Sequence, residues 1–110
     1  MNLSINVNET DILLKITLNG EIDAYTAPKL RETIIPLSVK NGINMVVDMS
    51  NVTYMDSTGL GVFVGVFKSV KANDGEFKMI GLSGRLKRLF DITGLAEIID
   101  INSQIEGERK

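Results

Sequence analysis

The chain has 110 residues, 44% of them hydrophobic and 24% charged, a composition that argues against wholesale disorder. This length suits one domain over residues 1–110, with one core. Twelve basic and fourteen acidic residues give a formal net charge of −2, so we expect no direct binding of DNA.

Histidine and cysteine are both absent. Their absence excludes disulfides, thiolate and imidazole metal sites, and a Ser-His-Asp triad. We therefore expect no metal, no other cofactor and no enzymatic activity. The N-terminal residues lack the pattern of a signal peptide, and no segment approaches ~20 consecutive apolar residues. These features predict a cytoplasmic protein without a membrane association.

The chain begins with two segments in which apolar and polar side chains alternate. They cover residues 3–7 and 12–18, and the polar turn 8–11 separates them. Alternation of this kind is typical of strands with one covered face, so we predict an antiparallel hairpin. Asn19, Gly20 and Glu21 then interrupt the pattern.

A first helix is predicted after residues 22–24. Pro28 is tolerated in a first helical turn, where Thr26 or Asp23 could serve as the cap. Pro36 should kink or end the helix. One face of this helix is predicted to be apolar, formed by Leu30, Ile34 and Leu37.

The pattern changes period in the middle of the chain. Residues 44–48 have the short apolar centre of a strand that is buried on both faces, and a loop is predicted to follow them. A second helix is predicted from about Ser57 to Asn73. Its core face should comprise Leu60, Phe63, Val64, Phe67 and Val70.

The opposite face of the second helix is small and partly apolar. It should face solvent and contains Thr58, Val62, Gly65, Val66 and Ser69. Glycine in a helix interior costs about 1 kcal/mol relative to alanine, which favours a special role such as docking of a partner. The alternative is internal packing, in which glycine lets another helix approach and the same chain covers the valines.

The remaining elements complete an α/β order. We predict a turn at 73–75, a strand at 77–80, a helix capped by Ser83 that ends near Gly94, and a short strand at 98–101. Leu86, Leu89 and Phe90 should face inward from this helix. Its basic residues, Arg85, Lys87 and Arg88, are interpreted as a solvated face. The ordered core should end near residue 101, with a frayed tail over 102–110.

Strands that alternate with helices after a hairpin predict a mixed, mostly parallel sheet with right-handed crossovers. Functional groups in such sheets collect at the carboxyl ends of the strands. Asp23 and the pair Asp56–Ser57 both follow strands and precede helices. We therefore expect them to share one edge of the molecule.

Three hypotheses account for Ser57 from the residues alone. It is a reversible phosphoacceptor in a protein-binding surface, an N-cap of the second helix, or part of a loop that binds the phosphate of a nucleotide. No P-loop lysine follows the glycines, which weakens the third hypothesis. Asp48 at a strand end suggests a phosphoaspartate site, but a structural role is the simpler interpretation because no partner acids or lysine can be identified.

Two motifs resemble a known family. The segment Asp56-Ser57-Thr58-Gly59-Leu60-Gly61, preceded by residues 46–50, is similar to the signature of the STAS-domain anti-sigma factor antagonists. The run 18–23 and residues 27–30 resemble the same family, as does the order of elements to about residue 101. The general stress type is the most similar. The resemblance implies the STAS fold.

The resemblance also implies a function. Family members bind an anti-sigma factor that is a serine kinase, and so free the sigma factor for transcription. Phosphorylation of the serine that matches Ser57 inactivates the antagonist, and a metal-dependent serine phosphatase restores it. The matching motif positions are Asp23, Asp56, Ser57, Thr58, Gly59 and Gly61. Thr58 is a secondary phosphorylation candidate, and a ligand-sensing or nucleotide-sensing STAS module or a scaffold component is the alternative function.

Overall fold

The computed structural model describes residues 2–11 and 13–102. Within these ranges five strands form one sheet in the order β1-β2-β3-β4-β5. β1 pairs with β2 antiparallel and the other neighbours are parallel, so the prediction of a mixed, mostly parallel sheet with an N-terminal hairpin is confirmed. The strands are β1 (Leu3–Glu9), β2 (Leu14–Ile22), β3 (Asn44–Met55), β4 (Glu76–Ile80) and β5 (Asp100–Asn102).

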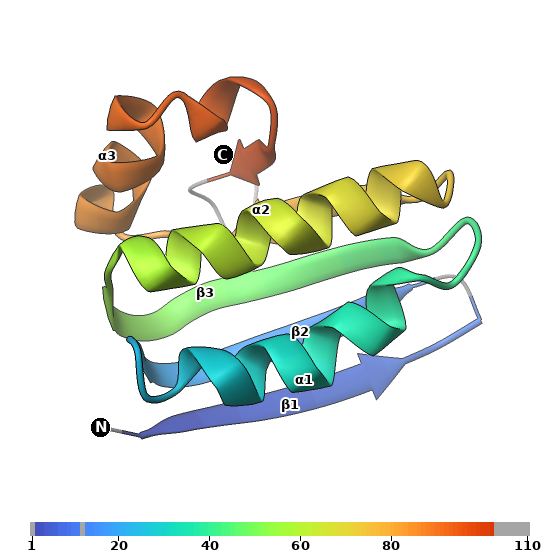
Figure 1. Ribbon diagram of the computed structural model, residues 1–110, viewed down its shortest axis with the longest axis horizontal. Helices are drawn as coiled ribbons and strands as arrows, with labels where there is room; N and C mark the ends of the chain where they lie inside the picture. The colour runs from blue at the N-terminus through green and yellow to red at the C-terminus, as the bar shows by residue number, and fades with distance from the viewer. Residues whose placement is uncertain (1, 12, 103–110) are drawn as a thin grey trace.

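The helices connect the parallel strands. They are α1 (Ala27–Ser38), α2 (Ser57–Ala72) and α3 (Gly84–Ile92), followed by the short 3-10 helix η1 (Leu95–Glu97). α1 and α2 lie side by side on one face of the sheet, and α3 lies beyond α2 (Figure 1). All three helices begin at the same edge, on the left of the view. No helix among the described residues is both long and apolar enough to span a membrane.

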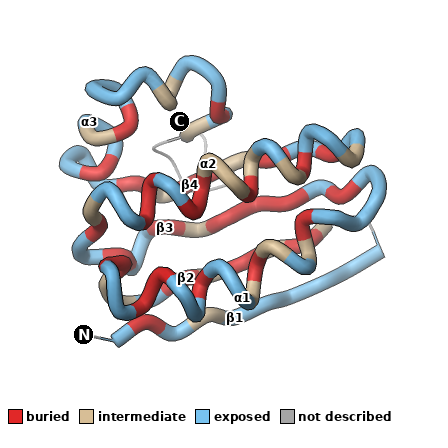
Figure 2. The backbone as a smooth tube through the Cα atoms, in the orientation of Figure 1, coloured by how far each residue is buried: buried red, intermediate tan, exposed pale blue. Residues whose placement is uncertain are grey.

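The main core lies between the sheet and the helix pair α1 and α2. Paired positions of β2 and β3 point the same way, as in Leu14 opposite Met45 and Ile16 opposite Val47. All four side chains are buried, and burial of each stabilises the fold by about 1.5–3 kcal/mol. Figure 2 shows buried positions along β2 and β3 beneath the helices and mostly exposed positions along β1.

The first two elements follow the sequence closely. The hairpin forms, although Ile12, which was predicted to begin its second strand, lies outside the described residues. α1 has Pro28 in its first turn, as predicted. Pro36 lies inside the last turn, and the helix ends at Ser38.

The central strand is longer than predicted. β3 continues from Asp48 to Met55, where the sequence suggested a loop. Its second half pairs with the end of β2, but the register shifts between Thr17 and Asn19 and again between Gly20 and Glu21. These irregularities place buried Val52 and Met55 three positions apart, so the alternation that identifies a strand is absent.

The prediction that Val62 and Val66 face solvent is wrong. Both are buried, with 1% and 0% of their surface exposed, because α1 packs against this side of α2 while the sheet covers the other. The Ser38 and Ser69 hydroxyls form a hydrogen bond of 2.8 Å between the two helices. Half-buried Gly65 also faces α1, since a Cβ there would lie 4.0 Å from Ile35. The alternative of internal packing is therefore correct for the valines.

The C-terminal part agrees with the predicted order. Ser83 caps α3, and its hydroxyl accepts a hydrogen bond from the Leu86 N–H at 3.2 Å. Gly94 has a positive φ of 79° and ends this unit, as its position suggested. The last strand begins at Asp100, because η1 and its connection occupy residues 95–99. Asn102 closes β5, and the rest of the predicted tail, residues 103–110, lies outside the described residues.

Candidate functional site at the carboxyl edge of the sheet

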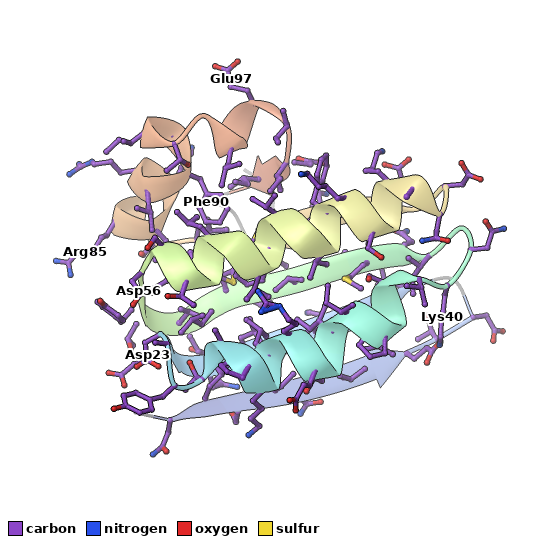
Figure 3. The ribbon with its side chains drawn as sticks, viewed as in Figure 1. Asp23, Lys40, Asp56, Arg85, Phe90 and Glu97 are labelled. Atoms are coloured by element: carbon purple, nitrogen blue, oxygen red, sulfur yellow. The ribbon has the colours of Figure 1, made fainter. Side chains whose placement is uncertain are left out.

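The ends of β2 and β3 lie next to each other at one edge of the sheet. Ile22 pairs with Met55, and the Asp56 N–H donates a hydrogen bond of 3.3 Å to the Ile22 carbonyl. The residues that follow, Asp23 and Asp56, therefore begin two adjacent connections. Figure 3 shows both at the edge where α1 and α2 begin. The prediction that they share one edge is confirmed.

Asp56 is the N-cap of α2. Its Oδ1 accepts a hydrogen bond from the Thr58 N–H at 3.0 Å, and its main-chain carbonyl accepts from the Gly59 and Leu60 N–H groups. A carboxylate in this position also complements the helix dipole. Ser57 is consequently the first residue of the helix, and the hypothesis that Ser57 is the N-cap is wrong.

The hydroxyl groups of Ser57 and Thr58 are free of hydrogen bonds within the described fold. Both residues are exposed, and neither side chain forms a hydrogen bond with any residue that the structure describes. An exposed hydroxyl without a structural partner can reach the active site of a modifying enzyme. Its modification would remove no contact that stabilises the fold.

Asp23 shapes the turn that leads into α1. Its Oδ1 accepts hydrogen bonds from the N–H groups of Tyr25 at 2.9 Å and Thr26 at 3.0 Å. The Thr26 hydroxyl accepts from the Asp23 N–H at 2.9 Å and donates to the Glu21 carbonyl at 2.8 Å. Asp23 is 7% exposed. Its carboxylate therefore holds the loop conformation, and Thr26, although it is the N-cap residue, makes no capping hydrogen bond with its side chain.

The loop held by Asp23 presents Tyr25 to solvent. The Tyr25 side chain is 87% exposed, and aromatic residues in such positions are typical of protein-binding surfaces. Tyr25 was not among the residues predicted from the sequence. A tyrosine in the short connection between a predicted strand and Pro28 was the available signal, because such loops lie at the carboxyl edge.

The two glycines of the motif have different surroundings. A Cβ at Gly59 would lie 2.6 Å from Met55 Cγ and 2.7 Å from Ile22 Cγ2, whereas a Cβ at Gly61 meets nothing within 4 Å. Gly59 thus permits close contact between α2 and the strand ends. Gly61 leaves a bare patch of backbone at the surface, one turn after Ser57.

Alanine substitution should separate these two roles. We expect Gly59→Ala to lower the free energy of unfolding by about 1–2 kcal/mol, because overpacking outweighs the gain in helix propensity. Gly61→Ala should raise it by up to about 1 kcal/mol, because the methyl group enters open space. Urea unfolding of both variants beside the wild type measures the difference. Equal shifts of the two midpoints would contradict the packing assigned to Gly59.

The two aspartates at this edge form no ion pair with a described residue. Three ion pairs occur among the described residues: Lys15 with Asp48, Lys40 with Glu9, and Lys71 with Glu76. None involves Asp23 or Asp56. Within the described part of the chain, no group of three acidic side chains is placed to hold a metal ion. Asp48 lies inside β3, where its Oδ1 accepts from the Ser50 N–H, in agreement with a structural role.

Comparison with known proteins agrees with this architecture. The STAS domain family matches residues 4–107. The anti-sigma-B factor antagonist of Listeria monocytogenes is 53% identical over 109 residues, which cover 98% of this chain and 95% of the relative. The name of this relative describes a regulator of an anti-sigma factor.

Solved structures show the same fold. An anti-sigma factor antagonist from Mycobacterium paratuberculosis superimposes with a TM-score of 0.85 at 23% identity, covering 96% of this chain and 89% of that one. The phosphorylated form of the Bacillus cell fate determinant SpoIIAA gives a TM-score of 0.69 at 20% identity, with coverage of 89% and 90%. The family match and the Listeria relative together identify the chain as a member of the STAS-domain family of anti-sigma factor antagonists.

Proposed function

We propose that this protein binds an anti-sigma factor that is also a serine kinase, and so frees a sigma factor in the cytoplasm. Phosphorylation of Ser57 by that kinase ends the binding, and a metal-dependent serine phosphatase restores it. The observation that carries the proposal is the exposed, unengaged hydroxyl of Ser57 on the first turn of α2. Thr58 shares this exposure and is the secondary acceptor.

The names of similar proteins support this role. The relative from Listeria monocytogenes is an antagonist of the anti-sigma-B factor. SpoIIAA, which has the same fold, has been solved in a phosphorylated form. A phosphorylation switch on this fold is therefore compatible with an intact domain.

The proposed binding surface is the docking edge, which we define as Tyr25, Asp56, Ser57, Thr58 and Gly61. Gly61 and the two hydroxyl residues are exposed on the first turns of α2, and Tyr25 lies on the neighbouring loop. Asp23 and Gly59 act behind this surface by shaping the loop and the strand contact. Gly65, half-buried against α1, and the buried Val62 and Val66 are removed from the set of partner contacts.

Charge provides the switch. A phosphoserine adds about −1.5 to −2 charges at pH 7, directly next to the Asp56 carboxylate. No Arg or Lys occurs from Met45 to Phe67, so the adjoining sequence offers no cation to neutralise them. The helix N-terminus tolerates an anion, which keeps the fold intact. The cost of phosphorylation therefore falls on the complex, where the dianion must lose water.

Mass spectrometry tests the acceptor assignment. The protein is incubated with ATP and the anti-sigma-B factor of Listeria monocytogenes, beside Ser57→Ala and the matched variant Thr58→Ala. We expect one phosphoryl group per chain in the wild type and in Thr58→Ala, and none in Ser57→Ala. Unchanged phosphorylation of Ser57→Ala would refute the assignment.

A ligand-sensing module is the second candidate function. It is favoured by a cavity of about 420 Å³ at the opposite edge, between the β1–β2 turn and the α1–β3 connection. The Lys40–Glu9 ion pair, at 2.7 Å, lies in its lining. Figure 3 shows Lys40 at the opposite end of the helices from Asp56, the residue before Ser57, so a ligand there would leave the docking edge uncovered.

A further inference from the structure

An apolar groove lies beside the docking edge, between the end of β3 and α3. Its volume is about 250 Å³. The exposed side chains Tyr54 and Ile92, with 44% and 75% of their surface accessible, belong to it. The full lining is Tyr54, Met55, Arg85, Leu86, Arg88, Leu89 and Ile92.

The rim of the groove is positively charged. Arg85 and Arg88 are exposed, and neither forms an ion pair with any residue that the structure describes. Lys87, between them in sequence, does not line the groove. From the sequence, the three basic residues were predicted to form one solvated face. The structure divides them, because the two arginines flank an apolar surface.

The groove and Ser57 are close enough to share one partner. Met55 lines the groove and precedes Ser57 by two residues, so their Cα atoms are at most about 7.6 Å apart. A standard protein interface covers about 800 Å² on each partner, which corresponds to a patch of about 16 Å radius. Figure 3 places Arg85, Asp56 and Asp23 along the same edge of the molecule. A protein seated over Ser57 therefore also covers the groove.

We propose that the groove is a second docking site for the same anti-sigma factor kinase, which inserts an apolar side chain flanked by carboxylates. The apolar side chain packs against Tyr54, Leu89 and Ile92, and the carboxylates pair with Arg85 and Arg88. Arginine forms such pairs with two parallel hydrogen bonds. This inference rests on the proposed function and adds to it the chemistry of the partner surface.

The groove contact has a different dependence on phosphorylation from that of the docking edge. The arginines lie on α3 and the phosphoryl group would sit on α2, so the groove contact adds to the affinity of both forms. Weakening it with the uncharged change Ile92→Asn should raise the Kd of both forms. The ratio of the two Kd values, which measures the switch, should stay well above one in Ile92→Asn.

Binding of the anti-sigma-B factor of Listeria monocytogenes tests the proposal by isothermal titration calorimetry at ~0.1 M salt. The groove variants are Ile92→Asn and the double variant Arg85→Glu with Arg88→Glu. The matched controls are Ile98→Asn, an exposed apolar residue outside the groove, and Lys87→Glu on α3. Thermal unfolding checks that all four variants remain folded.

We expect each groove variant to raise the Kd about tenfold or more, as for residues at the centre of an interface. The controls should stay within about twofold, as is usual for exposed residues at the margin of an interface. Wild-type Kd values for both groove variants would overturn the proposal, as would an equal loss in the controls. A dimer in the wild type that Ile92→Asn dissociates would also overturn it, since a second copy would then occupy the groove.

The Kd values distinguish a failure of this inference from a failure of the proposed function. If the groove is not a docking site, Ser57 phosphorylation still weakens binding while the groove variants do not. If the switch is wrong, phosphorylation leaves the Kd unchanged whatever the groove variants do.

Discussion

Phosphorylation of Ser57 should weaken binding to the anti-sigma-B factor of Listeria monocytogenes by a few hundredfold. The new dianion lies beside the Asp56 carboxylate, which is already the N-cap of α2. No cation in the adjoining sequence compensates it, so forming the complex would desolvate an unpaired charge at a cost of several kcal/mol. A cost of about 3–4 kcal/mol corresponds to this loss, because each 1.4 kcal/mol is tenfold in affinity.

Calorimetry on the purified phosphorylated and unphosphorylated proteins measures this effect. Ser57→Ala should unfold at the same temperature as the wild type and should show no loss of affinity after incubation with the kinase and ATP, because the Ser57 hydroxyl has no partner in the described fold and the acceptor is absent. Circular dichroism should give the same spectrum for both forms, since the charge sits at an exposed helix end. Equal Kd values, or a large spectral change on phosphorylation, would contradict a switch by local charge.

Val66→Asp should unfold the protein or nearly so. Val66 lies on α2 and has 0% exposure, so a carboxylate at this position would be withdrawn from water. Burial of an unpaired carboxylate costs several kcal/mol. This loss is comparable with the total stability of a small domain, about 5–15 kcal/mol.

Lys68→Asp is the matched control, because Lys68 is exposed on the same helix. Urea unfolding should show a cooperative transition close to that of the wild type for this variant and a greatly lowered midpoint, or none, for Val66→Asp. A stable Val66→Asp protein that had lost only its partner binding would restore Val66 to the docking surface, and the helix packing described above would then be incorrect.

The order of elements could be predicted from the sequence because the spacing of apolar residues and the residues that begin and end helices indicated the same elements. Ser57 to Asn73 was predicted as helix, and α2 spans Ser57–Ala72. Ser83 and Gly94 also took their expected positions at the ends of the α3 unit. In each of these cases the signal is local, so the residues that carry it lie within a few positions of one another.

Features that depend on distant partners were harder to predict. The second half of β3 is a strand because the end of β2 pairs with it through two register shifts, and no local pattern records that partner. Val62 and Val66 were predicted to face solvent because the helical period identifies one core face of a helix. It gives no information on whether a second helix packs against the opposite face. α2 has the sheet on one side and α1 on another, which leaves a narrower exposed strip than the period suggests.

The candidate site was predicted in part. The adjacency of Asp23 and Asp56 followed from the rule for parallel sheets and is confirmed. The cap was displaced by one residue, from Ser57 to Asp56, because either side chain can cap a helix and only the backbone geometry decides. Tyr25 and the α3 groove were missed, since exposure and the approach of α3 to β3 are properties of the tertiary structure.

The turn held by Asp23 has a consequence for the entropy of binding. Its carboxylate and the Thr26 hydroxyl fix the loop backbone before any partner arrives. Ordering a free backbone would cost about 1–2 kcal/mol per residue. Here that loss of conformational entropy has already occurred during folding. A partner that contacts Tyr25 therefore restricts only the rotation of the Tyr25 side chain. The loop is preorganised, and we expect the main chain at that point to keep its conformation when a partner binds.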